Sequence, residues 1–218
     1  MTGSIHDIHT HRADATRALI SVDPRQFDPQ PDKWYSVGFH PWHDVDRLTD
    51  DDFDLLQRCT LHPRVLAIGE TGMDRLRGAS LDVQERVFIR HLQLAAATGM
   101  PVIAHCVRTA QDILAARNRA GLSHVTVVVH GMRSNCNVAR MLLDAGCYLS
   151  FGALFNVDAL LATPLERLLI ETDDSPVTVD DVAAAVAAPL AMTADEVIAR
   201  VSANAHRLLF PAADQREC

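Results

Sequence analysis

The chain has 218 residues, of which 48% are hydrophobic and 22% charged, a composition that excludes intrinsic disorder, collagen and coiled coil. The net charge of -8 gives no general attraction to nucleic acid or to an anionic membrane, so contact with a polyanion needs a local basic patch. Five scattered cysteines without a C-x-x-C pair, no export signal and no apolar stretch of membrane-spanning length favour a cytoplasmic protein with one domain over residues 1–218.

Eight short apolar runs predict β-strands at residues 5–9, 18–22, 35–39, 65–70, 101–105, 125–130, 147–151 and 168–173. Several are continuous aliphatic runs, which are typical of strands buried on both faces of a parallel sheet. Capping residues predict helices at 80–99, 109–121 and 134–146, and a capping box at 193–196 leads into a final helix that ends near residue 209. Strands that alternate with helices predict an α/β fold, a (β/α)8 TIM-like barrel.

The first two connections between the predicted strands differ from the later ones. Residues 12–17 and 23–34 are too short or too rich in proline to hold crossover helices. Because a parallel crossover normally needs about a dozen residues, we expect the strand at 18–22 to run antiparallel, as a hairpin between its neighbours. The predicted barrel is therefore distorted and lacks the helices after its first two strands. Its bare flank would be covered by its own loops or by a partner subunit, in a monomer or a homodimer.

Histidine and acidic side chains stand where the predicted strands end. They are His9, His11, Glu70, His105, His130 and Asp173. The carboxyl ends of barrel strands meet on one face, where active sites of this fold are built. The pair His9 and His11 alone is equally consistent with an accidental polar strand end, and one or two of the six could simply be solvated. All six together predict a site for one or two divalent ions. The nitrogen and oxygen ligands favour Zn, Mn, Co, Ni or Fe over Mg or Ca.

Eight segments that span nearly the whole chain carry a resemblance. They read DIHTHR (7–12), VGFHPWH (37–43), AIGETGMD (67–74), PVIAHC (101–106), VVHGMRS (128–134), YLSFG (148–152), LLIETDDSP (168–176) and NAHRLLF (204–210). In this order they resemble the TatD family of metal-dependent hydrolases, and the forms HCVR and HGMR resemble its shorter members. The resemblance implies a (β/α)8-type barrel and, as in many members, a divalent-metal-dependent deoxyribonuclease.

The resemblance also implies roles for individual residues. It assigns two divalent ions (Zn, Mn, Mg, Co or Ni) to the same six positions: Glu70 bridges them, His9, His11 and Asp173 hold one, and His105 and His130 hold the other. Hydrolysis of DNA or a small phosphodiester would use a metal-activated water, with Asp173 as general base. Glu171 is expected to orient a ligand histidine or to support packing, and Asp74 to position a ligand or Arg75.

Three further side chains are predicted to contact the substrate. Arg108 and Arg133 follow ligand positions, and a guanidinium suits phosphate, although loop salt bridges are an equal alternative. His40 matches a family histidine near the substrate, with structural hydrogen bonding as its alternative. Lys33, the only lysine, stands at no strand end, which excludes a carbamylated-lysine metal bridge of the dihydroorotase or urease type.

Other functions stay open at the level of the sequence. The same metals could serve a hydrolase of another small ester, phosphoester or amide. A metal-binding barrel without turnover is a further alternative, although the six intact ligand positions argue against it.

Overall fold

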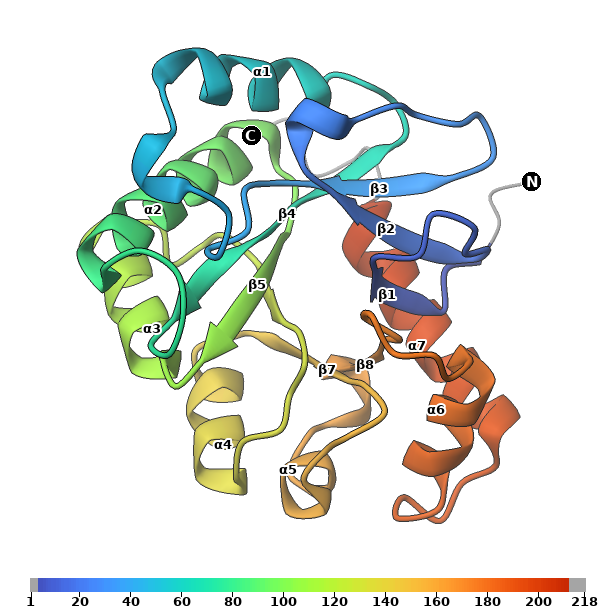
Figure 1. Ribbon diagram of the computed structural model, residues 1–218. Coiled ribbons are helices and arrows are strands. Elements are labelled where there is room, and N and C mark those ends of the chain that lie inside the picture. The colour runs from blue at the N-terminus through green and yellow to red at the C-terminus, as the bar shows by residue number, and fades with distance from the viewer. Residues whose placement is uncertain (1–3, 212–218) are drawn as a thin grey trace.

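The computed structural model describes residues 4–211, and its eight strands close into one barrel in chain order (Figure 1). The strands are β1 (Asp7–Thr10), β2 (Ala18–Val22), β3 (Trp34–Val37), β4 (Val65–Asp74), β5 (Val102–Val107), β6 (Val127–Val129), β7 (Tyr148–Phe151) and β8 (Leu168–Ile170). Each strand is parallel to the next, and β8 is parallel to β1. The predicted TIM-like barrel is confirmed.

The helices lie outside the barrel and leave one flank without them (Figure 1). They are α1 (Asp50–Thr60), α2 (Leu81–Thr98), α3 (Ala110–Arg119), α4 (Cys136–Asp144), α5 (Val157–Leu161), α6 (Val179–Ala187) and α7 (Ala194–Leu209). Within residues 4–211 no α-helix follows β1 or β2, as predicted; only the 3-10 turn Pro24–Gln26 interrupts those connections. None of these helices is both long and apolar enough to cross a bilayer.

The predicted antiparallel direction of residues 18–22 is wrong. β2 is parallel to both neighbours, with Asp7 beside Ala18 and Leu19 beside Trp34. The expectation assumed a long crossover. Because β1 has only four residues, the connection to the start of β2 has to run back over the length of that strand, about 13 Å. The seven residues 11–17 reach up to about 23 Å, which is enough without a helix. A parallel connection this short is possible because the strand before it is short.

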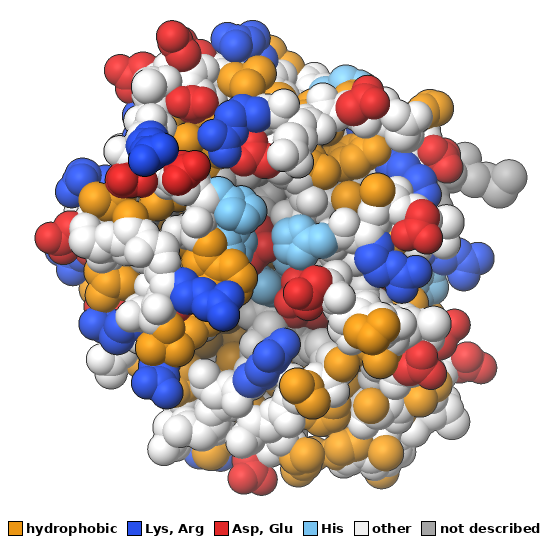
Figure 2. Space-filling model, in the orientation of Figure 1, with side chains coloured by type: hydrophobic (Ala, Val, Ile, Leu, Met, Phe, Trp, Pro, Cys, Tyr) orange, Lys and Arg blue, Asp and Glu red, His pale blue; other side chains and the backbone are white. Residues whose placement is uncertain are grey.

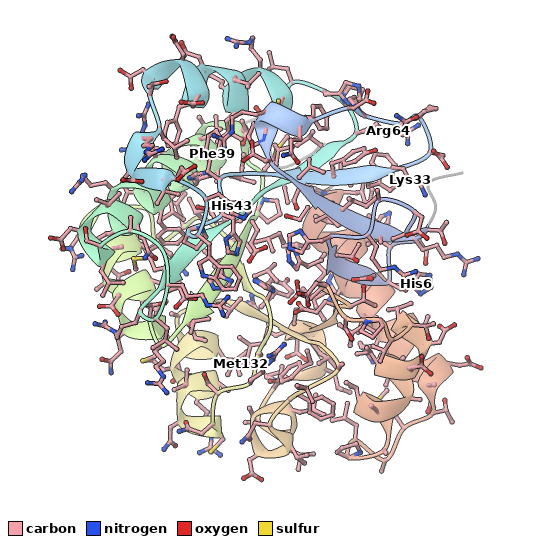
Figure 3. The ribbon with its side chains drawn as sticks, viewed as in Figure 1. His6, Lys33, Phe39, His43, Arg64 and Met132 are labelled. Carbon is pink, nitrogen blue, oxygen red and sulfur yellow. The ribbon has the colours of Figure 1, made fainter. Side chains whose placement is uncertain are left out.

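The helix-free flank is covered by parts of the same chain. The first four residues of β2 are buried, and Ile20 belongs to an apolar cluster against which Phe27 of the following loop packs. The Lys33 ammonium donates hydrogen bonds to the backbone oxygens of Asp14 and Ala15, at 3.2 and 2.8 Å. Figure 3 shows Lys33 on this outer flank, where it joins the two loops that replace the missing helices.

Several predicted boundaries need correction. Glu70, expected at a strand end, lies inside β4, because that strand continues beside β5 as far as Asp74. β6 and β8 are shorter than predicted and end before His130 and Asp173. The cap of α4 is Asn135 and not Ser134, since the Asn135 side chain accepts the first free N–H groups of the helix. Four cysteines are free thiols in the described part of the chain, and Cys218 lies outside it.

A buried histidine fixes the segment after β3. The Nε2 atom of His91, on α2, accepts the backbone N–H of Phe39 at 3.0 Å, and its Nδ1–H donates to the Val87 oxygen at 2.8 Å. The ring is fully buried and packs edge-on against Phe39 and Phe53. Burial lowers the pKa of His91 from 6.5 to about 4. His91 therefore stays neutral and joins α2 to the residue that precedes His40.

We predict that His91 makes stability sensitive to mild acid. Between pH 6.5 and about 4 the unfolded chain binds a proton on His91 that the folded chain excludes, so the free energy of unfolding falls by up to roughly 3 kcal/mol over this window. Urea denaturation from pH 7.5 to 4 should show a shallower fall in His91→Gln than in the original protein. The exposed His124→Gln is the matched control, and equal slopes for His91→Gln and the original protein would contradict the prediction.

Candidate metal centre

Imidazoles and carboxylates gather in a hollow at the carboxyl ends of the strands (Figure 2). Glu70 stands at the centre and is only 3% exposed. Five imidazoles have a ring nitrogen within 3.2 Å of its carboxylate: those of His9, His11, His40, His105 and His130. The structure thus brings together all six residues that were predicted as ligands, with His40 in addition.

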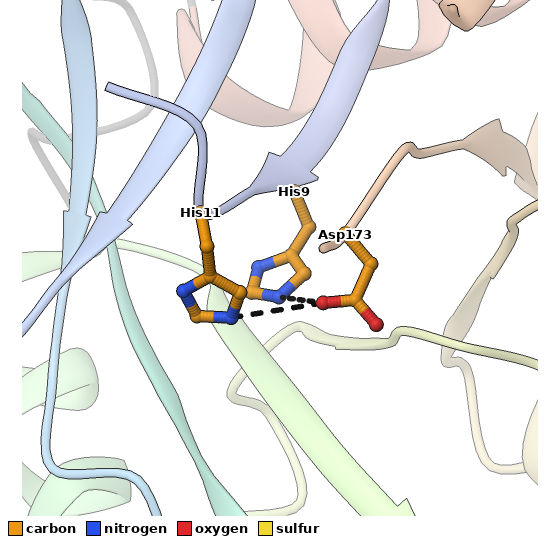
Figure 4. A group of neighbouring side chains, drawn as sticks. All are labelled: His9, His11 and Asp173. Atoms are coloured by element: carbon orange, nitrogen blue, oxygen red, sulfur yellow. Dashed lines mark ion pairs between the residues drawn. The ribbon is translucent and has the colours of Figure 1, made fainter. Parts of the chain in front are cut away.

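One carboxylate oxygen of Glu70 faces the histidines of β1 and Asp173. Glu70 Oε2 lies 3.2 Å from His9 Nε2 and 3.1 Å from His11 Nε2. Asp173 Oδ1 lies 3.6 Å from each of these nitrogens (Figure 4). Four donor atoms around one ion, with bonds of about 2.0–2.1 Å in a tetrahedron, stand about 3.3 Å apart. The four atoms are therefore spaced like ligands of a single small cation.

The other oxygen of Glu70 faces a second pair of histidines. Glu70 Oε1 lies 2.9 Å from His105 Nδ1 and 2.8 Å from His130 Nε2. His105 lies in β5 and His130 directly follows β6, and the His130 ring centroid also lies 4.2 Å from that of His9 in β1. The two oxygens of Glu70 thus face different nitrogen atoms, and Oε1 also lies 3.0 Å from His40 Nε2.

Two buried carboxylates lie behind the second pair. Asp74 Oδ2 lies 3.2 Å from His105 Nε2, and Glu171 Oε1 lies 3.3 Å from His130 Nδ1. Glu171 Oε1 also accepts the backbone N–H of Gly131 at 2.7 Å. Each carboxylate faces the ring nitrogen that points away from Glu70, so it favours the tautomer in which the nitrogen near Glu70 carries the free lone pair.

His40 differs from the other histidines in its tautomer. Its Nδ1 accepts the backbone N–H of Trp42 at 3.1 Å, so in the neutral ring the proton is on Nε2. That Nε2–H points at Glu70 Oε1, 3.0 Å away. Burial lowers the pKa of His40, against the opposing effect of Glu70. This tautomer presents a hydrogen-bond donor toward the centre, although a ring nitrogen of His40 also lies close enough to Glu70 and His105 to join a metal site.

The ring nitrogens of His9 lack hydrogen-bond partners within residues 4–211. The His9 ring is fully buried, yet neither of its nitrogens has a hydrogen-bond partner among the described residues, because the contact with Glu70 lacks the required alignment. A buried polar atom without a partner costs free energy. A cation between His9, His11, Glu70 and Asp173 would satisfy the Nε2 atom of His9. The donor set and its spacing suit metal binding.

The pKa values of the cluster show that its buried carboxylates are ionised and stabilised by neighbouring histidines. Burial raises the pKa of Glu70, but His130 and His9 outweigh this and hold it well below its ordinary range. Burial and His130 lower the pKa of His9, but Glu70 and Asp173 overcome both and raise it to about 9. Burial raises the pKa of Asp173, but the contact with His9 outweighs this effect and lowers the pKa to about 2. The raised pKa values of His9 and His130 show that positive charge on these two rings compensates the buried carboxylates.

A glycine places Glu70 in the mouth of the barrel. The register of β4 shifts between Ile68 and Thr71, and Gly69 in this irregularity has a φ of 137°. A Cβ on Gly69 would lie 2.5 Å from the backbone oxygen of Ile103 in β5. Only glycine fits this close approach. The glycine of the AIGE segment is therefore required for steric reasons. It allows β4 to direct Glu70 toward the surrounding histidines.

Some residues that shape the site were not predicted. Asp7 is 3% exposed and accepts hydrogen bonds from Thr172, at 2.6 Å from the hydroxyl and 3.1 Å from the backbone N–H. It thereby joins β1 to the segment that carries Asp173. The available signal was its place two residues before His9, on the same face of the strand.

The loop after β4 depends on another residue that was not predicted. Gln84 of α2 accepts the backbone N–H of Asp74 and donates to three backbone oxygens, those of Asp74, Arg77 and Ala79. Trp42 Nε1–H donates to Asp74 Oδ2 at 2.7 Å. Nothing in the sequence distinguishes Gln84 from an ordinary helix residue, whereas Trp42 stood inside the VGFHPWH segment.

Two arginines lie on one side of the cluster. Arg108 and Arg133 line a cavity of about 440 Å³ together with His105, His130 and Asp173. Both arginines are exposed, and neither forms an ion pair with an acidic side chain in residues 4–211. The salt-bridge alternative for these residues therefore has no support in the structure. Arg75, by contrast, pairs with Asp112 at 2.5 Å and not with Asp74.

The comparisons with known proteins agree with the fold and the cluster. The model of the family described as TatD-related DNase matches residues 25–210. The chain belongs to this family. Two of the relatives described next are named metal-dependent hydrolases. These names agree with a centre of histidines and carboxylates.

Individual relatives cover different shares of the chain. The uncharacterized metal-dependent hydrolase YabD of Bacillus subtilis is 28% identical over 90% of this chain and 83% of its own length. The uncharacterized hydrolase TatD of Mycobacterium tuberculosis is 35% identical over 63% of this chain, and the 3′-5′ ssDNA/RNA exonuclease TatD of Cronobacter turicensis is 34% identical over 64%. The matches span only 56% of each of these two proteins.

A solved structure supports the same fold. YjjV, a TatD homolog from Escherichia coli K12, superposes with a TM-score of 0.82 at 22% identity, over 96% of this chain and 99% of that one. At this identity the likeness establishes the barrel architecture.

We predict that Gly69→Ala disrupts the centre. The new Cβ would clash with the Ile103 oxygen at a positive φ, so we expect a loss of stability of roughly 3 kcal/mol or more, together with loss of metal binding. Urea denaturation and metal analysis of the purified variant measure both effects. Gly146→Ala is the matched control: its φ is 82° but no atom lies within 4 Å, so it should cost about 1 kcal/mol and leave metal content unchanged. Equal effects of the two substitutions would contradict the steric argument.

Proposed function

We propose that the protein is a divalent-metal-dependent phosphodiesterase that acts on DNA, RNA or nucleotides through two ions bridged by Glu70. The observation that carries the proposal is the division of the Glu70 carboxylate, with Oε2 toward His9 and His11 and Oε1 toward His105 and His130. A carboxylate whose two oxygens face different nitrogen atoms is able to bridge two ions, and this supports two-metal hydrolysis.

The proposed ligands fall into two sets. His9, His11, Asp173 and Glu70 would hold one ion, and Glu70, His105 and His130 the other. Imidazole and carboxylate donors suit Zn, Mn, Co or Ni, and Mg remains a candidate. Bound there, the metal would supply an activated water near neutral pH and positive charge for a phosphate. Asp74 and Glu171 would orient His105 and His130 from behind.

The remaining side chains account for proton transfer and phosphate binding. Asp173, ionised and partly exposed in the hollow, is the candidate general base. His40 presents an N–H that can donate to a substrate oxygen or a leaving group. Arg108 and Arg133, free of acidic partners in the described part of the chain, would bind phosphate oxygens.

Two further observations favour a phosphodiester over other substrates. The unpaired arginines line the same cavity as the cluster, where they offer guanidinium groups to a phosphate although Asp173 and Asp174 also line it. The name of the Cronobacter relative, a 3′-5′ ssDNA/RNA exonuclease, supports a nucleic acid substrate. Single-stranded DNA, duplex DNA, RNA and dinucleotides should be compared side by side.

We predict metal-dependent activity that requires His105. The purified protein should hold divalent metal and hydrolyse bis(p-nitrophenyl) phosphate, and chelation should abolish the reaction. His105→Ala removes the nitrogen that faces Glu70 Oε1, so metal content should fall by about one ion per chain and activity by at least about 100-fold. The exposed His206→Ala is the control and should match the original protein. Absence of bound metal, or full activity of His105→Ala, would refute the assignment.

We predict that Asp173→Asn separates turnover from binding of the second ion. The amide cannot accept a proton, so turnover should fall at least about 1000-fold, within the usual range for loss of a general base with its metal contact. The ion at His105 and His130 should be retained, because neither histidine contacts Asp173 in the ion-pair geometry. Metal analysis and phosphodiester kinetics measure the two effects. Turnover like that of the original protein would exclude Asp173 as the base.

We predict that the two arginines act on substrate binding. In Arg108→Ala and in Arg133→Ala the KM for the phosphodiester should rise about tenfold, because a charge-assisted hydrogen bond is lost, while metal content stays the same. Arg140→Ala, an exposed arginine of α4 outside the cavity, is the control. An unchanged KM in both variants would show that phosphate binds elsewhere.

A further inference from the structure

One aromatic side chain stands exposed at the mouth of the barrel. Trp42 is 41% exposed and lines the cavity of about 440 Å³ that contains the arginines. It also lines a second cavity, of about 630 Å³, on the other side of the cluster, which His11, His40 and Glu70 share. Ligands in either cavity therefore meet the indole beside the metal centre.

The indole is held rigidly where it stands. Its Nε1–H donates to Asp74 Oδ2 at 2.7 Å, and its ring centroid lies 4.7 Å from that of His40 and 5.1 Å from that of His105, both edge-on. The guanidinium of Arg77 lies 4.7 Å from the ring centroid. A ring that is already ordered loses little entropy when a ligand packs on it. The exposed apolar area is thus prepared for binding.

We propose that Trp42 is the platform on which a base of the substrate stacks while its phosphodiester lies at the cluster. The inference rests on the proposed phosphodiesterase function and deepens it, because it requires a base-bearing substrate and not merely a phosphate ester. Stacking on an indole tolerates every base, since each has a π-face, and strengthens binding by about 5- to 150-fold. The arginines bind phosphate, and Trp42 selects for nucleotides.

Trp42 has a second effect that the test must separate from stacking. The oxygen of Asp74 that accepts its N–H is the same oxygen that faces His105 Nε2. Loss of the indole therefore also disturbs the orientation of His105, for every substrate alike. Trp42→Phe keeps an aromatic face and removes the N–H, whereas Trp42→Ala removes both.

The first experiment compares substrates with and without a base. Thymidylyl-thymidine and its two analogues that lack one or the other base are hydrolysed by the original protein, Trp42→Phe and Trp42→Ala. The disturbance of His105 cancels in the ratio of kcat/KM between the base-bearing and base-lacking substrate. We expect this ratio to be kept within about threefold in Trp42→Phe and to fall about tenfold or more in Trp42→Ala, for at least one analogue. Leu61→Ala, another exposed apolar side chain, lines none of the cavities and should leave the ratio unchanged.

The second experiment measures binding without turnover. The chain has two tryptophans, so Trp34→Phe leaves Trp42 as the only indole. In that metal-loaded variant thymidine 5′-monophosphate should quench the emission of Trp42, whereas 2-deoxyribose 5-phosphate should not. A kcat/KM ratio that survives Trp42→Ala, or equal quenching by both ligands, would overturn the platform. Lack of hydrolysis of every substrate together with base-dependent quenching would refute the phosphodiesterase function and leave the platform standing.

Discussion

The centre of this protein depends on one buried carboxylate. Glu70 is almost fully enclosed, and five imidazoles approach it within 3.2 Å. A buried negative charge is costly unless positive charge or hydrogen bonds compensate it. His9 and His130, whose pKa values Glu70 raises, provide part of that compensation. The two oxygens of Glu70 face different histidines, so several imidazoles stabilise the same buried charge.

The barrel is organised so that these groups meet. The irregularity at Gly69 directs Glu70 into the mouth, and the bonds between Asp7 and Thr172 join β1 to the segment of Asp173. Buried carboxylates behind the cluster select the tautomers of His105 and His130. The Trp42 backbone selects the opposite tautomer for His40, whose Nδ1 accepts the backbone N–H of Trp42. Specific hydrogen bonds thus assign chemically different tasks to identical side chains.

The helix-free flank shows how a short chain can close a barrel. The connections after β1 and β2 are loops that Lys33 joins by hydrogen bonds. The residues of β2 are buried by the chain itself, and the cavity that Trp42 shares with His11 opens beside these loops. Loss of two helices therefore removes material from the outside of the barrel without exposing its core.

The sequence by itself determined the barrel and the six residues of the cluster, because buried parallel strands read as continuous apolar runs and polar residues at their ends are informative. It could not determine the direction of β2, since that depends on the span the loop has to cover, nor the true end of β4, which follows from pairing with β5. Only the tertiary structure showed which oxygen of Glu70 faces which histidine, the tautomer of His40 and the contact of Trp42 with Asp74. These are distances between segments far apart in the chain, and local patterns of residues contain no information on them.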